Sequence, residues 1–192
     1  MKAYLLLGLA FATPALAQAP AASAAGERSP AEATTPALAA CVDHARGAVK
    51  IEGKSRELDQ AGLKYQLNAP DFLASTKSTR LGIAEYAKSP STQGEIWAIG
   101  YASVDASGDS NSGACRLVAL GVPVPDVEKS ITDYFSKGRT WHLERGGDKP
   151  PPGVRTMTYT WSPRRNLKLT ALVELRDADN QASVTITQAF QN

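Results

Sequence analysis

Residues 107 to 115 read SGDSNSGAC and place Ser110 in a Gly-Asp-Ser sequence of the kind that presents a nucleophile in some hydrolases. A serine hydroxyl becomes a nucleophile beside a base, usually histidine, which a third group in turn orients. The chain offers His44 and His142 for this role, and the residues around Ser110 do not continue as they do in the hydrolases that share these letters. We therefore interpret the stretch as a turn between two strands and expect no catalytic residue in it.

His142 and Glu144 are a second candidate for acid–base chemistry. They alternate on an expected strand and so share one face, which permits a contact between the imidazole and the carboxylate. Pairs of this kind are usually ordinary surface contacts. A hydrolase of cell-envelope or extracellular substrates that uses His142 with Glu144 or Ser110 is therefore the alternative function, and the leading one is not enzymatic.

The loop from Asp105 to Gly113 could also hold a cation, because oxygen donors alternate along it. The donors are Asp105, Ser107, Asp109 and Asn111. An EF-hand that began at Asp105 would place Ser110 where a glycine belongs and Arg116 where the bidentate glutamate belongs, so this spacing excludes an EF-hand. We expect a solvated turn, with no metal and no cofactor.

Aromatic residues on the expected strands have two interpretations. They could stack a sugar ring or an apolar ligand, because aromatic rings offer a large contact area and a polar handle. Their alternation along the strands favours a place in the core instead. The residues concerned are Trp97, Tyr101, Trp141, Tyr159 and Trp161.

The first seventeen residues, MKAYLLLGLAFATPALA, have the order of a secretory signal peptide: a lysine, a short apolar run and small residues at the end. We expect cleavage before Gln18 and a periplasmic or secreted protein. Residues 18 to 36 are rich in Ala and Pro with few large apolar side chains, which predicts a flexible spacer. Residues 37 to 192 suffice for a single domain.

The cysteines, Cys41 and Cys115, are the only two in the chain. In an oxidising compartment such a pair predicts a disulfide. A zinc site is not expected, because the two cysteines and two histidines lack the spacing of zinc ligands.

Charge is nearly balanced, with 21 Lys and Arg against 19 Asp and Glu. Nucleic-acid-binding proteins usually carry a concentrated basic surface, so we expect no nucleic-acid partner. No segment after the leader has the apolar length of a membrane span.

Periodicity along the domain indicates a helix from about 36 to 47, a short helix near 55 to 63 and an amphipathic helix from 125 to 137. Alternation or turn signals predict six strands. These are 95–104, 114–122, 141–145, 154–161, 167–176 and 182–190. Short connections favour antiparallel neighbours. We therefore expect an α+β fold: a two-layer sandwich with a mostly antiparallel sheet of about five to six strands and helices on one face.

These observations favour an exported protein of the bacterial periplasm or cell exterior that acts as a non-enzymatic binding or protein-interaction module. Its partner, a protein or a small molecule, is not indicated by any motif.

Overall fold

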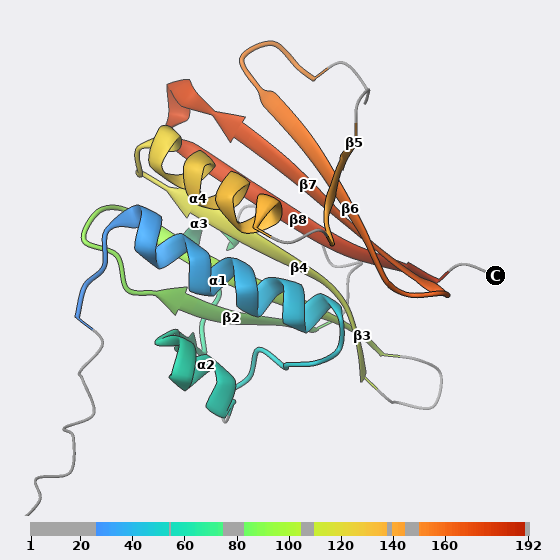
Figure 1. Ribbon diagram of the computed structural model, residues 1–192. Helices are drawn as coiled ribbons and strands as arrows, with labels where there is room; N and C mark the ends of the chain where they lie inside the picture. Colours follow the sequence, from blue (N-terminus) through green and yellow to red (C-terminus); the bar gives the residue numbers. More distant parts are fainter. Residues whose placement is uncertain are drawn as a thin grey trace, which may run out of the picture.

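A computed structural model describes residues 26–53, 55–74, 83–104, 110–137, 140–144 and 150–190. These residues form an α+β fold with one antiparallel sheet of 8 strands, in the order β1-β2-β3-β4-β8-β7-β6-β5 (Figure 1). The strands are β1 (Lys64–Gln66), β2 (Ile83–Ser89), β3 (Glu95–Val104), β4 (Ser110–Leu120), β5 (His142–Glu144), β6 (Arg155–Arg164), β7 (Leu167–Arg176) and β8 (Gln181–Phe190). The helices are α1 (Pro30–Ala45), α2 (Arg56–Ala61), α3 (Asp71–Ala74), α4 (Val124–Ser136) and a 3-10 helix, η1 (Asp177–Asp179). None of the helices in the described ranges has both the length and the apolar character that a bilayer crossing requires.

The sheet is larger than the five to six strands expected, because β1 and β2 extend it at one edge. The sequence of β2 hides its strand character, since both of its faces are partly covered. Ala87 and Ser89 are buried on the helix side, whereas Ala84 and Tyr86 pack into a small apolar cluster on the other side. A strand covered on both faces lacks the polar and apolar alternation that identifies a half-buried strand.

Helix α1 begins at Pro30, so the spacer predicted over 18–36 overlaps its first two turns. Ser29 and Glu32 form a capping box, in which each side chain accepts a hydrogen bond from the other residue's backbone N–H. Pro30 suits the first helical position, where its missing N–H costs no hydrogen bond. These capping residues lie within the Ala-rich and Pro-rich segment, whose composition predicted a spacer.

Helices α1 and α4 lie side by side on one face of the sheet, and both run in the same direction (Figure 1). The Ser130 hydroxyl of α4 donates a hydrogen bond to the Ala31 carbonyl of α1 over 3.0 Å. The apolar stripe expected of α4 is buried, with Val127, Ile131 and Phe135 all against the core.

Under these helices, the sheet contributes alternate residues to the core. Along β7 the side chains from Leu167 to Leu175 are buried at every second position, whereas the intervening ones are half-buried or exposed. The predicted alternation of this strand is confirmed, and the same alternation continues in the buried Ala182, Val184 and Ile186 of β8.

The opposite face of the sheet is partly covered over β2, β3 and β4. Trp97, Ile99 and Val118 are buried there beneath Phe72 and Leu73 of α3. The Phe72 and Trp97 rings meet edge to face with centroids 6.4 Å apart. One short helix therefore lies on the side of the sheet that was expected to carry none.

The order of elements is similar in the two halves of the sheet, but the halves are not symmetric in space. Helix α1 precedes β1 to β4, helix α4 precedes β5 to β8, and β4 pairs antiparallel with β8 at the centre of the sheet. The outermost strands, β1 and β5, are equally short. A two-fold axis between β4 and β8 would make α1 and α4 antiparallel, whereas both run in the same direction (Figure 1).

The predicted disulfide between Cys41 and Cys115 is present, with 5.1 Å between the two Cα atoms. It joins α1 to β4, so it links the helix to the central strand of the sheet on which it lies.

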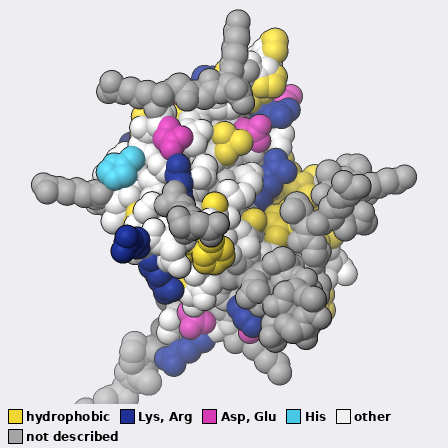
Figure 2. All heavy atoms as spheres, turned by 90° about the vertical axis from the view of Figure 1, so that its right-hand side faces the viewer, with side chains coloured by type: hydrophobic (Ala, Val, Ile, Leu, Met, Phe, Trp, Pro, Cys, Tyr) yellow, Lys and Arg dark blue, Asp and Glu magenta, His cyan; other side chains and the backbone are white. Residues whose placement is uncertain are grey.

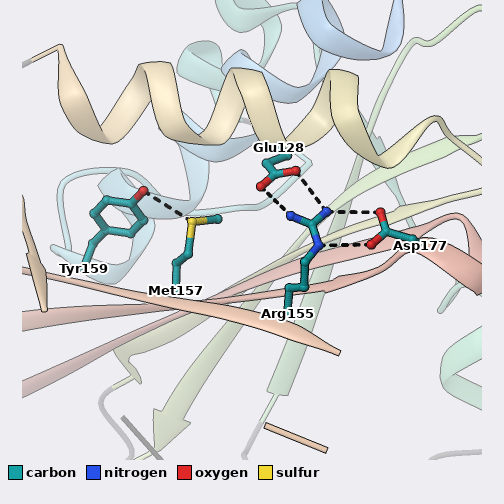
Figure 3. A network of polar contacts seen from close by, with 5 residues as sticks. All are labelled: Glu128, Arg155, Met157, Tyr159 and Asp177. Atoms are coloured by element: carbon teal, nitrogen blue, oxygen red, sulfur yellow. Dashed lines mark hydrogen bonds and ion pairs between the residues drawn. The ribbon is translucent and has the colours of Figure 1, made fainter. Parts of the chain in front are cut away.

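An ion-pair network fastens α4 to β6 and η1 (Figure 3). The Arg155 guanidinium of β6 donates to both carboxylate oxygens of Glu128 over 2.7 and 3.0 Å. It also donates to both oxygens of Asp177 over 3.0 and 3.1 Å. These contacts hold the pKa of the Asp177 carboxyl below its ordinary value, chiefly through the hydrogen bonds from Arg155.

Candidate functional site

Trp161 lies where β6 departs from regular pairing. The register of β6 against β7 shifts between Trp161 and Arg164, so the side chains of this segment are re-aimed as at a β-bulge. Strand β5 pairs only with residues Thr158 to Thr160, which leaves the far end of β6 as a sheet edge. Pro163 is tolerated there because an edge position needs no ladder N–H. The local sequence therefore places a tryptophan at an open corner of the sheet.

One hollow at this corner lies between α1 and α4 and has a volume of about 470 Å³. We call it the helix groove. Val42, Tyr134, Trp141 and Trp161 supply its apolar surface. Its polar lining consists of Thr35, Asp43, Arg46, Ser130, Asp133, Lys137 and Thr140.

Two further hollows share Trp161 with the helix groove. The first has a volume of about 290 Å³, and we call it the arginine hollow. It is lined by Arg46, Gly47, Ala48, Trp161, Pro163, Arg164 and Leu167. The second, of about 390 Å³, is lined by Thr140, His142, Thr160, Trp161 and Ser162, and we call it the threonine hollow. Strand alternation places the side chains of Thr160 and His142 on the sheet face opposite that of Trp161, so the threonine hollow opens on the face away from the helices. The Trp161 side chain belongs to the helix side, with the helix groove and the arginine hollow.

An aromatic cluster supports Trp161 from below. The Trp141 and Trp161 rings lie 5.5 Å apart, and the Phe135 ring lies 4.8 Å from Trp141 and stacks on Tyr159 at 4.6 Å. Trp141 is 9% exposed, so it is held firmly, whereas Trp161 is only partly buried and lines the helix groove and the arginine hollow. Packed neighbours fix the orientation of Trp161 before any ligand arrives.

Both helices end at this corner, as Figure 1 shows for α1 and α4. Their C-cap residues are Arg46 and Lys137, and cations are favourable at helix C-termini. The Arg46 guanidinium lies 5.4 Å from the Trp161 ring centroid and 3.4 Å from the Asp43 carboxylate. Figure 2, which looks onto this end of the molecule, shows hydrophobic side chains at the surface with Lys and Arg side chains beside them.

Tyr134 brings a phenol to the helix groove. Burial raises the pKa of this phenol to about 12, with a smaller contribution in the same direction from the nearby Asp43 carboxylate. The hydroxyl is therefore protonated throughout the physiological range. It makes no hydrogen bond to any residue in the described ranges, which leaves it free to bond a ligand.

The alternative hydrolase would use His142 with Glu144 or Ser110, and it stays untested because the side chain of Ser110 is not described. His142 and Glu144 are exposed on β5, and the Glu144 carboxylate accepts a hydrogen bond from the Lys168 ammonium at 3.3 Å. Ser110 begins β4, and its side chain lies outside the described residues. His142 lines the threonine hollow, on the sheet face away from the helices.

The ion-binding hypothesis for the loop from Asp105 to Gly113 stays untested. Residues 105 to 109 lie outside the described residues, as does the side chain of Asn111. Among the residues that are described, no group of three or more His, Cys, Asp or Glu is placed to hold a metal ion.

The aromatic residues singled out from sequence divide between the two faces of the sheet. Trp97 and Tyr101 belong to the cluster on the α3 side. Trp141, Tyr159 and Trp161 lie on the side of α1 and α4. A single platform of all these rings is therefore not formed, and Trp161 is the member of this set that lines both the helix groove and the arginine hollow.

His44 is a buried residue whose place the sequence did not indicate. Its Nδ1 accepts a hydrogen bond from the Ile51 N–H at 3.3 Å, so its proton is on Nε2, which faces the Tyr101 carbonyl at 3.5 Å. Burial lowers the pKa of this imidazole. The signal that could have located it is Gly100 in the middle of β3, because any Cβ there would lie 2.8 Å from the His44 ring.

Comparison of the chain with models of protein families, with curated proteins and with solved structures finds no match.

Proposed function

We propose that the protein is an exported, non-enzymatic binding module, and that its ligand site is the corner at which the helix groove and the arginine hollow meet. The observation that carries this proposal is the position of Trp161, a supported aromatic residue that lines both of these hollows. Ligand sites commonly join an apolar surface to a few polar groups in a concavity of roughly 300 to 1,000 Å³.

Export is part of the proposal. The leader of residues 1 to 17 supports it, and the disulfide between Cys41 and Cys115 fits an oxidising compartment such as the periplasm or the cell exterior.

A thermal-shift screen of the mature protein tests the proposal. The screen covers envelope sugars, lipids, peptides and divalent cations, because a ligand that binds only the folded state must raise the melting temperature. At a ligand concentration a hundredfold above Kd the stabilisation is about 2.7 kcal/mol. We expect at least one ligand to raise the melting temperature of the wild type, and to raise it less in Trp161→Phe and in Tyr134→Phe.

The control is Thr158→Ala, a change on β6 at a residue outside the three hollows. It should leave the shift as in the wild type. The proposed site would be overturned if no compound in the screen raised the melting temperature. It would also be overturned if Trp161→Phe and Tyr134→Phe left the shift unchanged.

A further inference from the structure

We infer that the end of the β6–β7 hairpin, together with Phe190 beside it, docks the protein onto a lipid surface that carries anionic headgroups. We call Arg164, Arg165 and Phe190 the hairpin tip. The inference goes beyond the proposed ligand site, because Arg165 and Phe190 line none of the three hollows. Three features of the hairpin tip carry it: its projection, its unpaired charge and its exposed aromatic ring.

The hairpin tip projects beyond the helices. Strands β6 and β7 pair as far as Arg164 and Leu167, and only Arg165 and Asn166 connect them. Leu167 pairs in turn with Phe190 of β8, so Phe190 lies on the last rung of the sheet beside the turn. Figure 1 shows this end of β6, β7 and β8 extending past the C-terminal ends of α1 and α4. The tip is therefore a narrow, projecting end of the sheet.

The charge of the hairpin tip is positive and unpaired. Arg164 and Arg165 are exposed, and neither forms an ion pair with any residue that the structure describes. The sequence from Ser162 to Val173 contains no acidic residue, and the sequence of β8 contains no charged residue. The strands that form the tip therefore supply no carboxylate to neutralise the two guanidinium groups.

Two neighbouring cations already have partners. Arg46, which lines the arginine hollow with Arg164, lies 3.4 Å from the Asp43 carboxylate. Lys168 lies 3.3 Å from the Glu144 carboxylate. The excess of positive charge is therefore concentrated on the two arginines of the tip. Arginine can bind a phosphate group through two parallel hydrogen bonds, and basic residues are attracted to anionic lipid surfaces.

Phe190 supplies the apolar part of the tip. It is 70% exposed, whereas its cross-strand neighbour Leu167 is only 5% exposed. An exposed aromatic side chain gains free energy when it enters the boundary between lipid headgroups and acyl chains. Phe190 lies across Leu167 from Arg164, so the ring and a guanidinium lie on the same side of the sheet. The ring can therefore enter the lipid while the arginines bind headgroup phosphates.

The size of the tip favours a lipid surface over an acidic protein. A stable protein interface buries roughly 800 Å² on each partner, with an apolar core inside a polar rim. The hairpin tip offers one large exposed ring beside a tight turn. A bilayer sets no such minimum area, because its headgroups can rearrange around a small projection and each basic residue adds to the attraction.

Co-sedimentation of the full mature chain with lipid vesicles tests the inference. One set of vesicles contains phosphatidylcholine with an equal part of phosphatidylglycerol, and the other contains phosphatidylcholine alone. We expect binding to the mixed vesicles to be about twentyfold stronger than to the neutral ones, because each unpaired arginine contributes about fivefold. The measurement is made at an ionic strength of about 0.1 M, where exposed charges act over roughly 10 Å. Further salt should reduce the preference.

Arg165→Gln should weaken binding to the mixed vesicles about fivefold. The matched control is Arg176→Gln, which removes the same charge at the opposite end of β7. Arg176 is likewise exposed and forms no ion pair in the described ranges. We expect this control to bind as the wild type does. Equal weakening by the two substitutions would show that net charge alone acts, and would overturn the tip as the docking surface.

Phe190→Ser should also weaken binding to the mixed vesicles about fivefold, because it removes the apolar group that enters the lipid. Phe190→Trp should retain binding, since tryptophan suits the membrane interface. Leu143→Ser is the matched control, because Leu143 is an exposed apolar residue of β5 that pairs with Tyr159, away from the tip. If Phe190→Ser bound as well as Leu143→Ser, the insertion of Phe190 would be wrong.

Equal binding to neutral and mixed vesicles would overturn the anionic surface, and absence of binding to both would overturn the docking. Inorganic phosphate is the probe for a free anion. If it raised the melting temperature through Arg164 and Arg165 while no vesicle bound, the tip would be a phosphate site and the inference would fail. Tyr134→Phe should bind vesicles as the wild type does, so this inference and the proposed ligand site can fail separately.

Discussion

At the scale of single residues, His44 is a titratable group whose burial makes stability depend on pH. It is only 4% exposed, and its Nδ1 must remain unprotonated to accept the Ile51 N–H. Burial lowers its pKa from the ordinary 6.5 more than the surrounding carbonyls and the Glu85 carboxylate raise it. The folded protein therefore resists protonation at this position.

We predict that the free energy of unfolding falls as the pH is lowered through 6.5, the ordinary histidine pKa. Below that pH the histidine is protonated in the unfolded chain but still neutral in the folded chain. The contribution of His44 to the free energy of unfolding is therefore fully present above the unfolded pKa and is lost as the pH falls towards the folded pKa. The slope from one histidine is at most about 1.4 kcal/mol per pH unit. Urea unfolding at a series of pH values measures it.

His44→Asn is the informative variant, because the asparagine oxygen can accept the Ile51 N–H but does not titrate. Its unfolding free energy should depend less on pH than that of the wild type. His142→Asn, at an exposed position, is the control and should keep the wild-type slope. An unchanged slope in His44→Asn would contradict the assignment to this residue.

At the scale of elements, the sequence was most informative where a strand or helix has one buried face. Helix α4 and strand β7 carry clear periodicities, and the structure places both close to the predicted bounds. Strand β2 was missed because small residues and two partly covered faces remove the alternation. Strand β1, only three residues long, is too short for any period to be recognised.

The site was only partly predictable for a different reason. Trp161 was identified as an aromatic residue with a possible ligand role, but its exposure depends on the register shift in β6 and on the shortness of β5. Neither feature is visible in local composition. Arg46 and Tyr134 reach the same corner from separate helices, so only the packing of α1 against α4 reveals them as part of one site.

The attachment of α4 to the sheet depends on Arg155, which bridges Glu128 of the helix and Asp177 of η1. We predict that Arg155→Gln lowers the free energy of unfolding by about 1 kcal/mol, because exposed ion pairs contribute little individually and this one is bidentate to two carboxylates. Urea unfolding at low and high salt measures the loss, which should shrink as salt screens the charges.

Arg165→Gln serves as the control, since this exposed arginine forms no ion pair in the described part of the chain. Its effect should remain within about 0.5 kcal/mol. Equal effects of the two substitutions would show that the network around Arg155 does not stabilise the fold.

At the scale of the whole molecule, the Cys41–Cys115 disulfide closes a loop between residues 74 positions apart. We predict that replacing both cysteines with alanine lowers the free energy of unfolding by about 4 kcal/mol, because the crosslink restricts the unfolded chain. Equilibrium unfolding of the oxidised protein, the reduced protein and the double variant measures this. A loss below about 1 kcal/mol in the reduced protein would contradict the prediction.

The pairing of β4 with β8 has a consequence for folding. Helix α4 and strands β5, β6 and β7 intervene along the chain between these two neighbours, so β4 remains an unpaired edge until β8 has folded against it. An unpaired strand edge can pair with another chain, so the partly folded protein is exposed to aggregation at β4.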